Sequence, residues 1–281
     1  MNIRPQTICF DSSVCIRRSR GKYPDADWRE MWKFVVKKCD YAIIPLVFTE
    51  LVLGVASGDE AHFGENRKAV KILYPTQRKQ FLAPPGSFVA EKVLGRRPTG
   101  DFLNEQSCVE EARILMAANS KAELSSGRVQ MPRNRKYLRG MDFGVLKSQM
   151  EHGQNDHIRT LEQLRAGSLA IPSAPEWVTL WMASLGVKLT PDEASRVTCA
   201  LDAAYRYEWF LWNEAKLGRY DFSKHKSDWI DSQLLYYLAD PNVHLVIDDS
   251  KFEHRISGSS QANRVHSYSD FVAQVVAPRG A

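Results

Sequence analysis

Four acidic residues stand where apolar segments of this sequence end or where helices are predicted to begin. Asp11 and Asp249 each follow a short apolar run that is typical of a buried strand. Glu50 lies about one helical turn after a third apolar segment, and Asp231 lies near the start of a predicted helix. The carboxyl ends of parallel strands meet at one edge of an open sheet, so Asp11 and Asp249 are expected at the same edge. Glu50 and Asp231 reach that edge only if their helices begin there.

Carboxylates gathered in this way favour metal-assisted hydrolysis. Ionised carboxylates that lie close together repel one another, and desolvation raises their pKa values further. A divalent cation such as Mg²⁺ relieves this repulsion, lowers the pKa of a bound water and neutralises charge on a scissile phosphate. Taken singly, each of these acids is more often a turn residue or a helix cap, and we interpret Asp27 and Asp192 as plain caps. Taken together, the acids predict a metal site that cleaves phosphodiester bonds.

The charge balance permits a nucleic-acid partner without requiring one. The chain has 281 residues, with 38 lysine and arginine residues against 33 aspartate and glutamate residues, for a net charge of +5. Residues 121–140 hold six basic residues and one acidic residue, so this stretch is a candidate phosphate-binding surface. Basic residues also follow the first candidate acid closely. The predicted nucleic-acid contacts are Arg17, Arg18, Arg20, Arg133, Arg135 and Lys136.

Other chemistries lack their characteristic patterns. The five cysteines are odd in number and show no Cys-x-x-Cys spacing, which disfavours a disulfide framework or a zinc site and favours a reducing compartment. The histidines show no zinc-hydrolase spacing, and neither a glycine-rich phosphate loop nor a Gly-x-Ser-x-Gly elbow occurs. The beginning of the sequence lacks the apolar stretch of a signal peptide, and no apolar run is long enough to span a membrane. We therefore expect a cytoplasmic protein without a membrane partner.

Strand and helix alternate in the N- and C-terminal parts of the chain, whereas the middle is mainly helical. This alternation predicts an α/β fold with an open, mostly parallel sheet and helices on both faces. We expect a discontinuous domain formed by residues 1–74 and 223–281. Residues 75–222 are expected to form a large, mainly helical insertion. In the α/β part, strands are predicted over 8–10, 42–44 and 244–247, and helices over 28–39, 47–56, 59–73 and 228–238.

The order of the acidic motifs resembles that of the PIN-domain nucleases. Their first motif, a strand running into an Asp and small or hydroxyl residues, matches Asp11–Ser13, and their second, Glu-Leu before a Gly, matches Glu50–Gly54. Their third and fourth motifs match Asp231–Leu235 and Asp248–Phe252. The resemblance covers roughly residues 5–73 and 223–277. The chain departs from the family in its length, about twice that of the usual domain, and in Ile247, where the family often has Thr or Ser.

This resemblance implies an α/β/α sandwich with the activity of a metal-dependent endoribonuclease. Carried over by position, the ligands of Mg²⁺ or Mn²⁺ are Asp11, Glu50, Asp231 and Asp249, with Asp228 as an additional acid. RNA is the expected substrate, and DNA remains open. An antitoxin or another regulatory protein, and a second copy of the chain, are further partners that the resemblance leaves open.

Three alternatives remain at this stage. The first is a module that binds nucleic acid or protein on a PIN-like fold without catalysis. The second is a structure-specific DNA nuclease, which uses the same acidic chemistry. The third is a phosphatase of the haloacid-dehalogenase type, whose first motif needs a second Asp two residues after the first. Ser13 occupies that position here, which disfavours the phosphatase.

Overall fold

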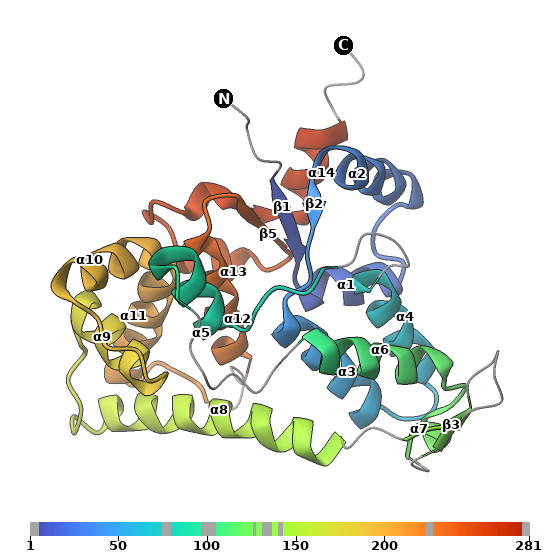
Figure 1. Ribbon diagram of the computed structural model, residues 1–281, viewed down its shortest axis with the longest axis horizontal. Coiled ribbons are helices and arrows are strands. Elements are labelled where there is room, and N and C mark those ends of the chain that lie inside the picture. The colour runs from blue at the N-terminus through green and yellow to red at the C-terminus, as the bar shows by residue number, and fades with distance from the viewer. Residues whose placement is uncertain are drawn as a thin grey trace.

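The computed structural model describes residues 6–74, 80–96, 105–125, 128–130, 137–139, 143–222 and 227–276 (Figure 1). Its central sheet is parallel throughout, with the strand order β2-β1-β5-β6. The strands are β1 (Thr7–Phe10), β2 (Asp40–Tyr41), β5 (Val243–Ile247) and β6 (Val265–Ser267). Because β1 pairs with β5, the two ends of the chain build one sheet. The predicted α/β fold with a parallel sheet is therefore confirmed, while the assignment to a PIN-like fold stays a prediction.

Helices from the first 74 residues pack around this sheet in two groups. The bounds are α1 (Ser12–Ser19), α2 (Asp25–Lys38), α3 (Pro45–Ser57) and α4 (Phe63–Leu73). Helices α1, α3 and α4 pack against one another, whereas α2 packs against α14 (Tyr268–Val276). The buried ring of Phe10 lies 5.7 Å from Trp28 and 6.3 Å from Trp32, so aromatic contacts fix α2 beside β1. These contacts leave the end of β1, where Asp11 follows, next to α1.

Two cap assignments from the sequence are wrong. Helix α2 begins at Asp25 after Pro24, so Asp27 lies inside its first turn, where a negative charge still suits the helix dipole. Helix α10 (Pro191–Ala200) is capped by Thr190 and not by Asp192. Thr190 forms a capping box with Glu193, and the intervening proline fits the first helical position because it has no N–H to satisfy there.

The middle of the chain is mainly helical, as predicted, with one small exception. A two-stranded antiparallel sheet lies in the basic stretch, where the sequence pattern predicts no strand. The elements are α5 (Pro85–Val89), the short π-helix η1 (Ala90–Leu94), α6 (Glu105–Ala117), α7 (Lys121–Ser125), β3 (Arg128–Gln130), β4 (Tyr137–Arg139), α8 (Phe143–Arg165), α9 (Ala174–Ser184), α10 and α11 (Asp202–Lys216).

The helical middle and the α/β part share one hydrophobic core. Ile43 forms an isolated parallel bridge with Phe81, and the rings of Phe88 and Tyr237 lie 4.8 Å apart. Helix α8 runs along one side of the molecule and contacts α3, α11 and α12 (Asp228–Leu235) (Figure 1). The remaining elements are η2 (Tyr236–Ala239), α13 (Ser250–Arg255) and η3 (Ala262–Arg264). Helices from the middle of the chain are thus packed against α3 and α12, which carry candidate acids, while the division into a domain and an insertion stays a prediction.

Two further expectations concern the membrane and the cysteines. In the part of the chain that the structure describes, no helix combines the length and the apolar character needed to cross a membrane. All five cysteines are free thiols, and four of them are buried in the core.

Candidate functional site

Asp11 and Asp248 lie side by side at the carboxyl edge of the sheet. The backbone N–H of Asp11 donates to the carbonyl of Val246 at 3.0 Å, which continues the ladder between β1 and β5 by one residue. The N–H of Asp248 donates to the Ser13 hydroxyl at 3.3 Å. The same hydroxyl donates to the Asp11 carboxylate at 2.5 Å, so Ser13 joins the two strand ends.

The Asp11 carboxylate caps α1 and lies where water reaches it poorly. It accepts the backbone N–H of Ser13 at 3.1 Å, and the Ser12 hydroxyl lies 3.4 Å from its other oxygen. Burial raises the pKa of Asp11, and the hydrogen bonds from the two serines offset part of that rise. The strand places this acid at the sheet edge, and the serines hold its carboxylate there.

Glu50 approaches Asp11 from α3. Pro45 occupies the first position of this helix, which places Glu50 in its second turn, and the Ser12 side chain lowers the Glu50 pKa slightly. Burial and the negative charge of Asp11 raise the pKa of Glu50 to about 7. The charge of Asp11 therefore acts on Glu50, while the role of the two acids as metal ligands stays a prediction.

Asp231 approaches the same corner from α12. Burial raises its pKa well above the usual value, and the negative charges of Asp11, Asp228 and Glu50 raise it further. The Tyr207 hydroxyl donates to its carboxylate at 3.2 Å, which offsets part of this effect. No lysine or arginine pairs with Asp11, Glu50 or Asp231 among the ion pairs of the described residues. We call these three residues the unpaired acids.

The unpaired acids have the ligand chemistry of a magnesium or manganese site, because both ions favour carboxylate oxygens. Their mutual repulsion and raised pKa values are relieved by a bound cation. Within the described ranges, however, no three acidic, histidine or cysteine side chains are grouped closely enough to hold an ion as they stand. Cation binding would therefore require these side chains to move closer together.

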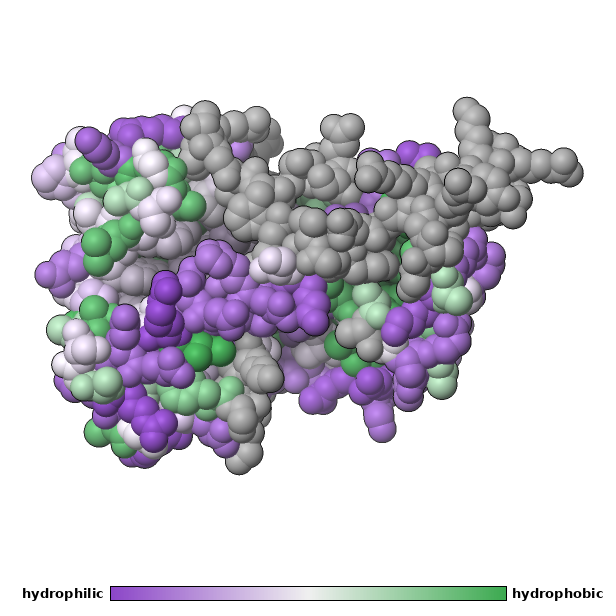
Figure 2. Space-filling model, turned by 90° about the horizontal axis from the view of Figure 1, so that it is seen from below, coloured by the Kyte–Doolittle hydropathy of each residue, from purple (hydrophilic) through white to green (hydrophobic). Residues whose placement is uncertain are grey.

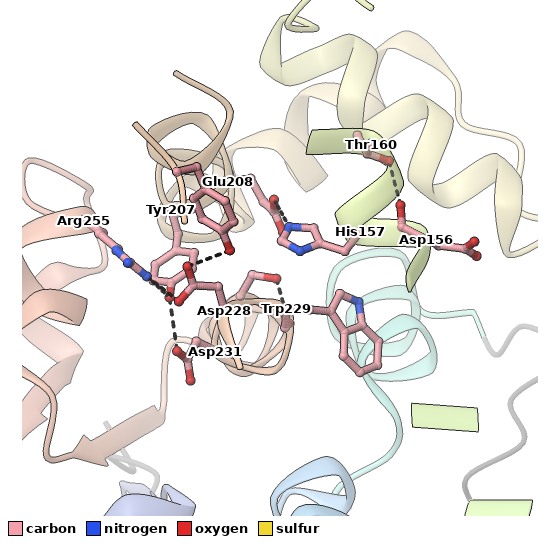
Figure 3. A network of polar contacts seen from close by, with 11 residues as sticks. Asp156, His157, Thr160, Tyr207, Glu208, Asp228, Trp229, Asp231 and Arg255 are labelled. Atoms are coloured by element: carbon pink, nitrogen blue, oxygen red, sulfur yellow. Dashed lines mark hydrogen bonds and ion pairs between the residues drawn. The ribbon is translucent and has the colours of Figure 1, made fainter. Parts of the chain in front are cut away.

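Asp228, the predicted additional acid, is buried in a paired network (Figure 3). The Arg255 guanidinium donates to its carboxylate at 2.9 Å, and the Tyr220 hydroxyl donates to the other oxygen at 3.0 Å. Arg255 also donates to the Tyr207 hydroxyl at 2.5 Å, and Tyr207 in turn reaches Asp231. Arg255 thus neutralises Asp228 and orients Tyr207, so any cation would have to compete with a guanidinium for Asp228.

A second buried pair lies beside this network. His157 of α8 and Glu208 of α11 meet with 3.1 Å between Nε2 and Oε2, and their side chains are only 10% and 6% exposed. Burial alone would lower the pKa of His157, but the charges of Glu208 and Asp228 raise it above the usual value. Figure 3 shows the pair close to Asp228. The Arg255–Asp228 pair thus joins α13 to α12, and the His157–Glu208 pair joins α8 to α11.

Asp249 is exposed and caps α13. Its carboxylate accepts the backbone N–H of Lys251 at 2.9 Å. The neighbouring Asp248 lies next to Ser13 at the sheet edge. Its carboxylate accepts a hydrogen bond from the Tyr23 hydroxyl and pairs with Arg17 at 2.9 Å. The role of Asp249 as a metal ligand stays a prediction.

The predicted arginine contacts separate into different surroundings. Arg17 is about half exposed and reaches the sheet edge through Asp248. Arg18 makes its contacts within the protein, because it pairs with Asp25 at 2.6 Å and lies over the Trp28 ring. Arg20 is about half exposed and lies 3.9 Å from Glu65. Three predicted contacts, Arg133, Arg135 and Lys136, lie outside the described residues.

Sequence reasoning misses the groups that position the unpaired acids. The sequence pattern indicates only the core of the insertion for Tyr207, and it indicates no role for Arg255. Neither residue has a local signal, because 24 residues separate Tyr207 from Asp231 and 27 separate Arg255 from Asp228. Comparison with known proteins adds no further guide, since no family model, curated protein or solved structure matches this chain.

Proposed function

We propose that this protein is a metal-dependent nuclease that cleaves phosphodiester bonds, with RNA as its substrate. The observation that supports the proposal most is the gathering of Asp11, Glu50 and Asp231 without a cationic partner in the described structure. Paired acids only one helical turn away show that this fold can supply such partners where it needs them. An acid cluster left without them favours a cation that arrives with the reaction.

In this proposal the chain holds Mg²⁺ or Mn²⁺ through Asp11, Glu50 and Asp231. When bound, the ion supplies a lowered pKa for a coordinated water and neutralises charge on the scissile phosphate. The serines at the start of α1 orient Asp11, and the Tyr207 hydroxyl orients Asp231. Glu50, with a pKa of about 7 without a cation, loses its proton as the ion binds, so binding should tighten as pH rises.

The substrate part of the proposal depends on charge. The chain is basic overall, and its most basic stretch lies in the insertion. Of the described arginines near the site, Arg17 is the one whose guanidinium lies at the sheet edge, where it can contact a substrate phosphate. RNA rather than DNA follows only from the resemblance to PIN-domain nucleases, so both substrates belong in the test.

A cleavage assay tests the proposal directly. Labelled single-stranded RNA and the matching DNA are incubated with Mn²⁺, Mg²⁺ or EDTA, using the wild-type protein and Asp11→Asn. We expect metal-dependent cleavage of RNA that falls by at least about 100-fold in the variant, because the substitution removes a ligand charge. Equal turnover by the two proteins would refute the assignment of Asp11. Cleavage of DNA alone would refute RNA as substrate but keep the site.

A further inference from the structure

A large hollow on the described surface lies between helices of the middle of the chain and α12, and none of the unpaired acids lines it. It has a volume of about 1230 Å³. Residues of α8, α9, α11 and α12 line it, together with the 169–172 segment. Pockets for single small molecules usually measure about 300–1,000 Å³, so this hollow exceeds that range. We call it the α8–α9 groove.

The lining of the α8–α9 groove is rich in tryptophan. Trp177, Trp181, Trp212 and Trp229 all line it. Trp229 of α12 lies directly against Gly153 of α8, where a Cβ atom would meet the indole ring at 2.3 Å. A glycine at this position therefore allows the indole to pack against α8. Trp212 is buried and the other three tryptophans are partly buried. Tryptophans in a concave surface are typical of the anchoring pockets of protein interfaces.

Two leucines at the groove are unusually exposed. Leu180 is 67% exposed and Leu169 is 41% exposed. The described surface has four strongly exposed large hydrophobic residues, and the other two, Trp209 and Leu217, lie outside the groove lining. Figure 2 shows hydrophobic patches among hydrophilic residues on the face that carries α8. Apolar area that stays exposed at the rim of an aromatic groove favours contact with another apolar surface.

The charge of the groove favours a basic partner over a nucleic acid. Its described lining contains Asp156, Glu176 and Glu208 but neither lysine nor arginine, although the whole chain is basic. Glu208 is buried and paired with His157, and Asp156 contacts His152 and Arg159, which lie outside the lining. Glu176, which pairs with no lysine or arginine among the described ion pairs, and the half-exposed Asp156 would repel phosphates and attract lysine or arginine.

We propose that the α8–α9 groove binds an amphipathic helix of a partner protein, with an apolar face and flanking basic residues. A groove lined by helices suits one more helix, whose apolar side chains at every third or fourth position pack into the groove. The tryptophans contact that apolar face, and Asp156 and Glu176 pair with the lysine or arginine side chains beside it. Since Trp229 and Gln233 of α12 line the groove, the bound helix contacts the same element that carries Asp231. The proposal does not depend on nuclease activity.

Selection from a library of displayed helices tests this proposal without requiring the natural partner. Helices of about 18 residues are displayed with apolar residues fixed along one face and every other position randomised. They are selected on the wild-type protein, and the enriched helices are synthesised and titrated against Leu180→Asp. Leu217→Asp is the matched control, because Leu217 is 61% exposed and lies outside the groove lining. Both leucines are on the surface, so melting curves should show that both variants fold.

We expect the enriched helices to carry more lysine and arginine than the starting library. Their affinity should fall by at least about tenfold in Leu180→Asp and stay unchanged in Leu217→Asp. Failure to enrich any helix, enrichment of acidic helices, or equal binding by Leu180→Asp would overturn the proposal. Self-association of the wild-type protein that Leu180→Asp abolishes would also overturn it, because the occupant would then be a second copy. RNA binding that depends on Leu180 would do the same.

Discussion

Two sets of acids lie around α12, and they differ in whether a cationic side chain neutralises them. Asp228 is buried against Arg255 and Tyr220, and Glu208 behind it is paired with His157. Asp231, one helical turn further along, is affected by the charges of Asp11 and Glu50, and among the described residues only the Tyr207 hydroxyl donates to it. The first set connects elements of the fold, whereas the second raises the pKa values of its own members. An acid that the fold leaves without a counter-charge, beside acids that have one, is the better candidate for binding a cation.

The paired set should give the largest loss of stability. Replacing Arg255 by Met leaves Asp228 buried without its cation, and breaking a buried pair in this way typically costs about 3–5 kcal/mol of unfolding free energy. Urea denaturation measures the change. Arg219→Met is the control, since Arg219 is largely exposed and its pair with Glu214 should contribute less than about 1 kcal/mol. Equal losses of stability in the two variants would show that the buried Arg255–Asp228 pair contributes no more than an exposed pair.

The unpaired set should make stability depend on pH. The pKa of Glu50 rises from 4.5 to about 7 on folding, so the folded protein holds this proton more tightly than the unfolded chain does. Glu50 should therefore contribute a fall in stability of up to about 3.4 kcal/mol as pH rises from about 4.5 through 7. Glu50→Gln should flatten this part of the curve, as measured by urea denaturation across the pH range.

A second glutamate provides the control for this pH effect. Burial also raises the pKa of Glu111 to about 7, but no acidic neighbour contributes. The contribution of Glu111 to the pH dependence of the unfolding free energy should be unaffected by Mn²⁺, whereas the contribution of Glu50 should shrink when the ion binds. If Mn²⁺ changes both contributions alike, its effect does not come from the unpaired acids.

Replacing aspartate by asparagine should change the stability of the protein in opposite directions in the two sets of acids. Asp11→Asn removes a charge that repels Glu50 and Asp231 and keeps a side chain that can cap α1, so we expect a gain of about 1 kcal/mol without metal. Asp228→Asn weakens the contact with Arg255 and should destabilise the protein. Thermal melting in EDTA compares the two variants. A loss of stability in Asp11→Asn would show that this acid is structural.

Asp249 should give the smallest effect. Asparagine caps a helix about as well as aspartate, so Asp249→Asn should change stability by less than about 0.5 kcal/mol. In the cleavage assay, its activity should fall by less than that of Asp11→Asn, because Asp249 is exposed in this structure. Loss of cleavage as complete as in Asp11→Asn would instead place Asp249 among the metal ligands.

The sequence predicted the parts of this structure that depend on local patterns. Apolar runs located β1 and β5, and their parallel pairing predicted Asp11 and Asp249 at one edge. In the structure it is Asp248 that bonds to Ser13 there, and Asp249 caps α13. Caps were less predictable, because proline and threonine compete with aspartate for the first turn, as at Thr190. The Arg255–Tyr207–Asp231 contacts were beyond prediction, since they depend on how α11, α12 and α13 pack rather than on spacing along the chain.

The most direct test of the cation site is a titration with Mn²⁺ alone. Melting temperature is measured from micromolar to millimolar Mn²⁺ for the wild-type protein, Asp11→Asn and Glu111→Gln. A site formed by the unpaired acids should stabilise the wild-type protein by about 2.7 kcal/mol at an ion concentration 100 times the Kd. Glu111→Gln should respond in the same way, and Asp11→Asn should lose most of the response. Identical stabilisation of Asp11→Asn, or none in the wild-type protein, would contradict the assignment of these acids to a cation site.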